Sequence, residues 1–354
     1  MARRELSPAQ MSVVQGIQVM LEALGRSCDS RSQARGACAA RSRSAQDDEK
    51  RGTSARISTV RVACSGGADS LALTAGLAWL DAHKPDPLRR SEVMIVDHGL
   101  QAGSDEVAAG VAGVVRGLGL PAEVARVDVQ VGDDGLEAAA RDARYEVLTR
   151  GDVDVVLLGH TMDDQAETVL LGLARGSGTR SLAGMPDAWA IGGVTLMRPL
   201  LGLRRTATRQ ACADWGLTPW DDPMNNDEHF ARVRARRLLP VMDEALGPGI
   251  VEALARTARL ARADADYLDE AAGALLRQSG DPGLPVSAVL AAPQALRGRV
   301  VRSWLAGLGV TELSFERTQA VLALVEDWRG QAGVDLPGGY QVVRNKQILR
   351  LRAG

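Results

Sequence analysis

The sequence predicts an α/β protein: a parallel sheet with helices on both faces, followed by a smaller, mainly helical C-terminal domain. From residue 57 onward, short β-branched runs alternate with longer stretches of helical spacing. This alternation is typical of parallel sheets. Beyond residue 240 a long helical pattern and several shorter ones take over. A length of 354 residues fits two domains.

The N-terminal region predicts one helix and then a disordered insert. Ser7 and Pro8 suit the N-cap and first position of a helix, which we expect within residues 1–25. Residues 26–56 are rich in Ser, Arg, Ala and Gly and hold almost no large apolar residue. Such a stretch buries too little surface to offset its ordering entropy. We therefore expect disorder over 26–56.

The region 57–240 predicts the parallel sheet. Helical spacing between the strands, as in 70–82 and 106–119, supplies the covering helices. Strands are expected at 58–64, 92–97, 122–129, 153–159 and 193–197.

The region 241–354 predicts the second domain. Pro240 and the Gly-Pro-Gly at 247–249 mark the end of the first domain, and a long helix is expected over 251–276. The tail at 335–352 predicts a small hairpin or meander.

Composition narrows the function. With 42 basic and 44 acidic side chains the net charge is −2, so the chain is not a globally basic nucleic-acid binder. The four cysteines form no C-x-x-C pair, which leaves zinc, iron–sulfur and disulfide scaffolds unsupported. An apolar run of about 18 residues and a secretory signal pattern are both missing. We expect a cytoplasmic protein without membrane association.

The end of the first strand carries a candidate phosphate site. Ligands of such sheets bind beyond the carboxyl ends of the strands. The turn consists of Ser65, Gly66, Gly67, Ala68, Asp69 and Ser70. Its glycines allow backbone N–H groups to face a phosphate at a helix N-terminus, and Asp69 could hold Mg²⁺. Spacing alone leaves an ordinary strand–helix turn as the alternative. The chain has neither a Walker loop nor G-x-G-x-x-G.

Two further strand ends carry candidate ligand-binding residues. Asp97 and His98 follow the second strand, where an adenine or ribose could rest; a lone His there is otherwise structural. Gly159 and His160 follow the fourth strand.

A group of acids comes directly after the fourth strand. A helix starting near Met162 would place Asp163 and Glu167 on one face, with Asp164 beside them. These acids either cap the helix or form a metal site beside the phosphates.

Basic and aromatic residues complete the candidates. Arg141 and Arg144 share a helical face, and either lie in solvent or reach a phosphate. Arg175 opens a Gly- and Ser-rich loop that could close over a nucleotide. Trp215 and Trp220 either pack in the core or stack on a base. The densest basic cluster is Arg232, Arg234, Arg236 and Arg237.

Together these blocks resemble the tRNA(Ile)-lysidine synthetases, members of the PP-loop ATP pyrophosphatase superfamily. The first turn, S-G-G-x-D-S, resembles the PP-loop itself. The resemblance continues through VDHGLQAGS, LEAAARDARY, GHTMDDQAETVLLGLARGSG, RPLLGLRR and WDDPMNND. It covers about residues 60–249, and the C-terminal part is more loosely similar to the family's tRNA-binding domain.

The resemblance implies an adenine nucleotide alpha hydrolase-like fold, with an ATP-binding catalytic domain at 57–240 and a tRNA-binding domain at 241–354. It implies ATP and Mg²⁺ as cofactors, and free L-lysine and a CAU-anticodon tRNA(Ile) as substrates. ATP would adenylate the C2 oxygen of the wobble cytidine and release pyrophosphate. Lysine would then attack C2 and expel AMP, giving lysidine.

The resemblance also implies residue roles. Ser65 to Ser70 would cradle the phosphates, and the arginines at 141, 144 and 175 would offset charge on the α-phosphate. The cluster at 232–237 would contact the tRNA backbone, with a solvated helix end as the alternative. Asp69, Asp163, Asp164 and Glu167 would divide between them magnesium coordination and the recognition or deprotonation of lysine.

Two other functions compete with this one. Another PP-loop tRNA-modifying enzyme, such as a thiolase, would rely on paired cysteines, which are absent. A catalytically degenerate ATP- or RNA-binding protein would have no need of the acidic set.

Overall fold

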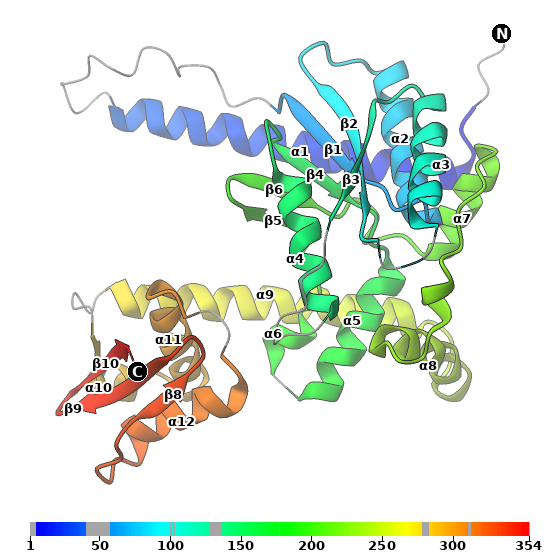
Figure 1. The fold of residues 1–354 in the computed structure, drawn as a ribbon. Coiled ribbons are helices and arrows are strands. Elements are labelled where there is room, and N and C mark those ends of the chain that lie inside the picture. Colours follow the sequence, from blue (N-terminus) through cyan, green and yellow to red (C-terminus); the bar gives the residue numbers. More distant parts are fainter. Residues whose placement is uncertain are drawn as a thin grey trace. The chain divides into compact units, whose positions relative to one another are not determined.

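The computed structural model describes residues 5–39, 57–99, 101, 103–127, 136–176, 178–277, 283–310 and 313–353 (Figure 1). The chain folds as two compact units. The first comprises Met1–Leu171 and Met185–Ala255, and the second comprises Gly172–Gly184 and Arg256–Gly354. No helix in these described ranges has the length and apolar character needed to cross a bilayer.

A six-stranded sheet forms the centre of the first unit, in the order β3-β2-β1-β4-β6-β5. All five predicted strands are present and parallel to their neighbours among them, which confirms the predicted fold class. They are β1 (Thr59–Ala63), β2 (Arg90–Asp97), β3 (Ala122–Arg126), β4 (Val155–Leu158) and β6 (Val194–Met197).

The strand β5 (Ala188–Ile191) was not predicted, and it pairs antiparallel with β6 at the sheet edge. The two are joined by Gly192 and Gly193, both with positive φ. A Gly-Gly pair between two short apolar runs is a hairpin signal that could have revealed it.

Helices cover both faces of this sheet, as expected. Alternate strand residues face opposite sides: Val60 and Val155 belong to a core shared with α1, α2, α3 and α7, while Val156 and Leu196 belong to a core shared with α4. The helices of this unit are α1 (Pro8–Ala39), α2 (Ala68–His83), α3 (Ser104–Gly117), α4 (Leu136–Thr149), α5 (Met162–Arg175), α7 (Arg205–Asp214), the 3₁₀ turn η1 (Pro223–Asn226) and α8 (Ala231–Leu246).

The helix α1 is longer than predicted. It runs to Ala39, so the expectation of disorder from residue 26 is wrong for 26–39. Ala, Arg and Gln are strong helix formers, and the stretch holds no proline. The chain therefore extends a helix whose first half is already docked. The rest of the expected insert, 40–56, lies outside the described residues.

The second unit combines helices with a four-stranded antiparallel sheet in the order β7-β10-β9-β8. The predicted meander is confirmed and gains a fourth strand, the short β7 (Leu284–Pro285). Trp304, Leu305 and Leu324 lie in its core. Its remaining elements are α6 (Thr179–Leu182), the second part of α9 (Ile250–Arg277), α10 (Val286–Ala291), α11 (Gln294–Gly307), α12 (Phe315–Glu326), β8 (Val334–Leu336), β9 (Tyr340–Asn345) and β10 (Ile348–Ala353).

The boundary between the units differs from the predicted one at residue 240. Pro240 lies inside α8, and the first unit continues to Ala255 within α9. Proline removes one backbone donor, a loss that a helix tolerates where its other contacts hold it. Leu239 supplies such a contact, since it is buried against Val251.

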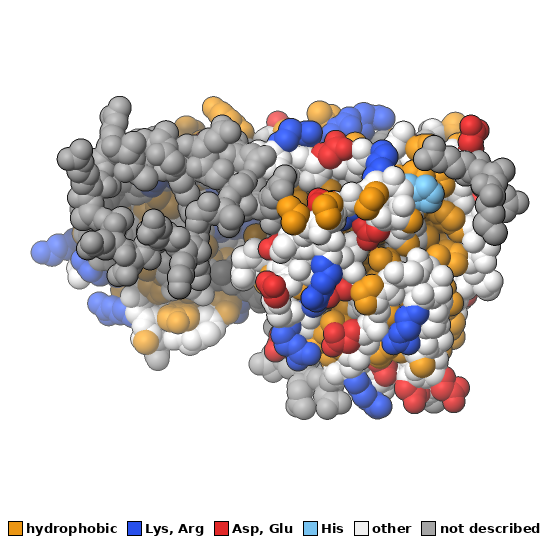
Figure 2. All heavy atoms as spheres, turned by 90° about the horizontal axis from the view of Figure 1, so that it is seen from above, with side chains coloured by type: hydrophobic (Ala, Val, Ile, Leu, Met, Phe, Trp, Pro, Cys, Tyr) orange, Lys and Arg blue, Asp and Glu red, His pale blue; other side chains and the backbone are white. Residues whose placement is uncertain are grey.

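Charges of both signs are interspersed among the described residues on the face shown in Figure 2. Over the whole sequence the net charge is −2.

Docking of α1 gives the first testable prediction. Ile17 is fully buried against the core of the first unit, whereas Val19 is 61% exposed. Ile17→Ala should lower the free energy of unfolding by about 2–5 kcal/mol, because it removes buried methylenes and leaves a cavity. Val19→Ala should change it by less than about 0.5 kcal/mol. Equal effects in denaturant titrations would show that α1 is not part of the core.

Candidate active site

The carboxyl ends of β2, β1 and β4 open into one cavity. These strands are adjacent and parallel, and the order of connection reverses at β1, where α/β sheets bind ligands. The cavity has a volume of about 760 Å³. Of the predicted site residues, Ser65, Gly67, Ala68, Asp69, Ser70, His98, Arg144, Gly159, His160, Asp164 and Arg236 line it.

The turn after β1 has the tight geometry that its glycines predict. Gly66 has a φ of +86°, and a Cβ there would lie 2.4 Å from a methyl of Val111. A Cβ on Gly159 would lie 3.0 Å from the backbone of Asp69 and Ser70. The Ser70 hydroxyl accepts from the N–H of Ser65 at 3.2 Å and donates to the carbonyl of Gly67 at 3.0 Å. These hydrogen bonds fix the conformation of the turn at the N-terminus of α2.

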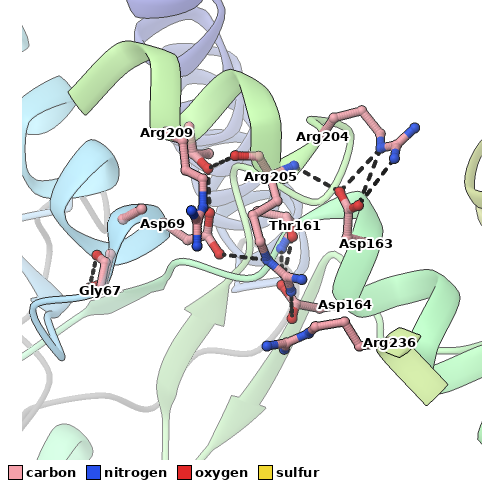
Figure 3. A network of polar contacts seen from close by, with 12 residues as sticks. Gly67, Asp69, Thr161, Asp163, Asp164, Arg204, Arg205, Arg209 and Arg236 are labelled. Carbon is pink, nitrogen blue, oxygen red and sulfur yellow. Dashed lines mark hydrogen bonds and ion pairs between the residues drawn. The ribbon is translucent and has the colours of Figure 1, made fainter. Parts of the chain in front are cut away.

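An arginine that the sequence analysis did not single out joins the acids. Arg205 lies 2.6 Å from Asp164, 3.2 Å from Glu167 and 3.4 Å from Asp69 (Figure 3). Glu167 is fully buried and also pairs with Arg236 at 2.8 Å. Two guanidinium groups therefore neutralise one inaccessible carboxylate.

Two of the carboxylates that line the cavity, those of Asp69 and Asp164, ionise differently. Burial raises the pKa of Asp69 to about 6, and neighbouring Asp164 adds to this, while the Thr208 hydroxyl and Arg205 oppose it. Burial alone would also raise the pKa of Asp164. There, however, Arg205 and the N–H and hydroxyl of Thr161 prevail, and the pKa lies below its ordinary value. Asp69 alone of the pair changes charge near neutral pH.

The predicted magnesium site of Asp69, Asp163 and Asp164 is not formed. Within the described ranges, no three His, Cys, Asp or Glu side chains converge as metal ligands. The reason is electrostatic, because the Arg205 guanidinium occupies the space among the acids. Asp163 is turned to Arg204 at 3.2 Å and to the Arg205 backbone N–H at 2.7 Å. The three acids therefore form no metal site by themselves; Mg²⁺ bound together with a nucleotide's phosphates, which needs only one or two carboxylates, stays a prediction.

Two buried polar atoms in the cavity wall lack a partner. They are Nδ1 of His98 and Nε of Arg144. Burial, and then the charge of Arg144, lower the pKa of His98 below its ordinary value. Unpaired buried groups are costly, so a polar ligand such as a nucleotide fits this wall.

Several predicted residues lie elsewhere. Asp97 is buried and accepts from the N–H of Gly99 at 2.9 Å, so it shapes the turn instead of lining the cavity. Arg141 is exposed and does not line the cavity. Arg175 is exposed in the part of α5 that belongs to the second unit. Trp215 packs against the core.

The arginine cluster of α8 is divided. Arg236 faces the cavity and binds the buried carboxylate of Glu167, and its role as a tRNA contact stays a prediction. Arg234 is exposed and donates to the carbonyls of Glu228 and His229. Arg237 is exposed and pairs with Glu228. Arg232, Arg234 and Arg237 stay predictions for tRNA binding.

The signal for Arg205 was present in the sequence. Arg204 and Arg205 stand at the N-terminus of α7, where the helix dipole disfavours cations. Such a breach of a local rule marks a site with compensating partners. Trp220 also lines the cavity, and its backbone N–H donates to the carbonyl of Gly66 at 3.0 Å.

Comparison with known proteins identifies the family. Residues 41–242 match the PP-loop domain, and residues 284–350 match the TilS substrate binding domain. The tRNA(Ile)-lysidine synthase of Salinispora tropica is 50% identical over 80% of this chain and 88% of its own length. That of Rhodococcus erythropolis is 52% identical over 80% and 85%. The chain belongs to the tRNA(Ile)-lysidine synthase family.

A relative from Nocardia farcinica with the same name is 51% identical over 80% of this chain and 87% of its own length. Among solved structures, the U34-tRNA thiolase NcsA from Methanococcus maripaludis, with its [4Fe-4S] cluster, has a TM-score of 0.47 and 17% identity, over 57% of this chain and 71% of that one. Membership of the lysidine synthase family confirms the resemblance drawn from the sequence.

The raised pKa of Asp69 predicts a pH-dependent stability. The folded state binds this proton more tightly than the unfolded chain, so stability from Asp69 is fully present below its ordinary pKa and lost as pH rises through about 6. Wild type should therefore lose about 2 kcal/mol relative to Asp69→Asn between pH 4 and about pH 7. Denaturant titrations at several pH values measure this. A difference independent of pH would contradict the burial of this carboxyl group.

Proposed function

We propose that this protein ligates free L-lysine to C2 of the wobble cytidine of a CAU-anticodon tRNA(Ile), at the expense of ATP. The observation that carries the proposal is the single cavity in which a phosphate-binding turn and a cluster of acids meet. The family's PP-loop domain and substrate binding domain support it.

ATP binding is supported by the cavity wall. Backbone N–H groups at the N-terminus of α2, with the hydroxyls of Ser65 and Ser70, suit the β- and γ-phosphates that leave as pyrophosphate. Arg144 and His98 bring unpaired polar atoms for the rest of the nucleotide. The positive charge of Arg144 would offset charge developing on the α-phosphate during adenylation.

Lysine binding is supported by the acids. An ammonium group entering beside Asp69 and Asp164 would meet carboxylates that now pair with Arg205. The amine must lose a proton before it attacks C2. Asp69 lies beside the phosphate-binding turn, and with its pKa near 6 it is ionised at pH 7 yet basic enough to accept that proton.

The two steps then follow in one place. The C2 oxygen of cytidine attacks the α-phosphate and pyrophosphate leaves; the lysine amine then attacks C2 and AMP leaves with that oxygen. Mg²⁺ bound with the phosphates of ATP would neutralise part of their charge, and Asp69 beside the phosphate-binding turn would help to hold it. Because free lysine and tRNA are found in the cytoplasm, we infer that the protein is located there.

The test is incorporation of labelled lysine into a CAU-anticodon tRNA(Ile) with ATP and magnesium present. The same RNA with uridine at the wobble position is the control. Label in the cytidine RNA alone establishes substrate, nucleophile and position. Pyrophosphate release without incorporation of label would support the adenylation step but exclude lysine as the nucleophile. If neither RNA gives label or pyrophosphate release, a catalytically degenerate ATP- or RNA-binding protein becomes the better interpretation.

Contact between α8 and tRNA is tested separately. Arg234→Gln with Arg237→Gln removes two exposed charges without touching the cavity. Binding of tRNA should weaken, and its salt dependence should flatten by about one unit of slope for each phosphate that is no longer neutralised. Arg116→Gln, an exposed arginine on α3, is the matched control. Unchanged affinity in filter binding would place the RNA contact elsewhere.

A further inference from the structure

A buried arginine, Arg198, follows β6 and has neutral partners. It is 4% exposed, its Nη1 donates to the carbonyl of Pro186 at 2.6 Å, and its guanidinium carbon lies 4.0 Å from the centre of the Trp189 ring. In the described part of the chain no carboxylate pairs with it. Burial lowers the pKa of Arg198 to about 10. A charge buried without a counter-ion is costly, and its retention points to a specific task.

The guanidinium also donates to the Tyr145 side chain, and a further contact defines its task. Nε of Arg198 donates to Nδ1 of His160 at 3.1 Å. A guanidinium carries donors only, so Nδ1 must accept. The single proton of the neutral ring is therefore on Nε2. A second proton, on Nδ1, would place an N–H of the ring against the Nε–H of Arg198. It would also place a cationic imidazolium beside the guanidinium cation.

The surroundings of His160 keep the ring uncharged. Burial lowers its pKa to about 3, followed by the charge of Arg198. Arg144 of α4 and Arg232 of α8 act in the same direction, and Asp164 of α5 opposes them.

The position of Arg198 is itself held from two sides. The amide of Gln165, on α5, accepts from the N–H of Met185 at 2.7 Å and donates to its carbonyl at 3.0 Å. This pairing fixes the segment that carries the Pro186 carbonyl. Trp189 covers the guanidinium from the edge strand β5. Arg198, which contacts the ring of His160, is therefore itself fixed by Pro186 and Trp189.

His160 lines the nucleotide cavity directly after Gly159, which approaches the phosphate-binding turn. We propose that Arg198 is a positioning residue that fixes His160 as an uncharged Nε2–H donor to an acceptor atom of the bound nucleotide. The inference deepens the proposed function and rests on it. It also assigns proton transfer from lysine to the carboxylates, because a ring held in this form neither takes nor gives a proton.

The tautomer is measured directly in the free protein. The chain has four histidines, so ¹⁵N-histidine labelling gives a spectrum that His160→Gln assigns. We expect the His160 Nε2 protonated, Nδ1 unprotonated and no titration between about pH 5 and 9. Titration near its ordinary pKa, or a proton on Nδ1, would overturn the proposal.

Variants of the arginine test the cause. In Arg198→Met the ring should lose its fixed tautomer, because Nδ1 no longer faces a donor, while burial still keeps it uncharged. Arg116→Met, on the exposed face of α3, should leave it unchanged. A ring that stays fixed in a folded Arg198→Met protein refutes the positioning role. If Arg198→Met does not fold, the proposal is tested by the tautomer and titration seen in the wild-type spectrum.

The donor role has its own test. Addition of ATP should shift the Nε2–H signal. An unchanged signal with ATP bound, as judged by calorimetry, refutes the donor role. Failure of ATP to bind refutes the proposed function, but it does not affect the assignment of the tautomer.

Substitutions of His160 test the donor role by kinetics. Gln carries an amide N–H near the position of Nε2, so His160→Gln should lose less than about 10-fold in ATP turnover and His160→Ala about 10- to 100-fold. Equal losses would favour acid–base chemistry.

Discussion

The neutralisation of buried carboxylates by Arg205 is the interaction on which the rest of the site depends. Asp69, Asp164 and Glu167 come from two different helices, and their charges would repel one another if no cation lay among them. A buried carboxylate that loses its partner is strongly destabilising. The guanidinium therefore fixes α2, α5 and α7 relative to one another. The same contact opposes the rise in the pKa of Asp69 that burial causes, so it acts on both the stability and the chemistry of the site.

Much of the first unit could be predicted from local patterns. The β-branched runs give the five parallel strands, and the Gly66–Gly67 pair gives the turn, because period and backbone freedom are local properties. The acids after β4 could be located but their partners could not. Arg205 is separated from Asp69 by well over a hundred residues, and no local pattern reports such a pairing. The predicted magnesium ligands were located in the same way, but the sequence did not reveal that Arg205 lies among them.

Other differences arise where local and long-range effects compete. Low apolar content predicted disorder from residue 26, yet helix propensity carries α1 on to Ala39. The strand β5 holds a single β-branched residue, Ile191, which gives it a weak pattern of its own, and it pairs with the edge of β6. That same strand supplies Trp189 to Arg198, so a minor element of the fold supports a residue of the cavity wall, His160.

The way in which the chain divides between its two units has a practical consequence. The second unit contains residues 172–184 as well as 256–354. Within it, Arg180 pairs with Asp266 and Asp269, and Arg262 donates to the carbonyls of Ala183 and Gly184. A fragment starting at 256 would lose these contacts. A single cut there would not give the whole second unit, so a transplant or an exchange between relatives has to include residues 172–184.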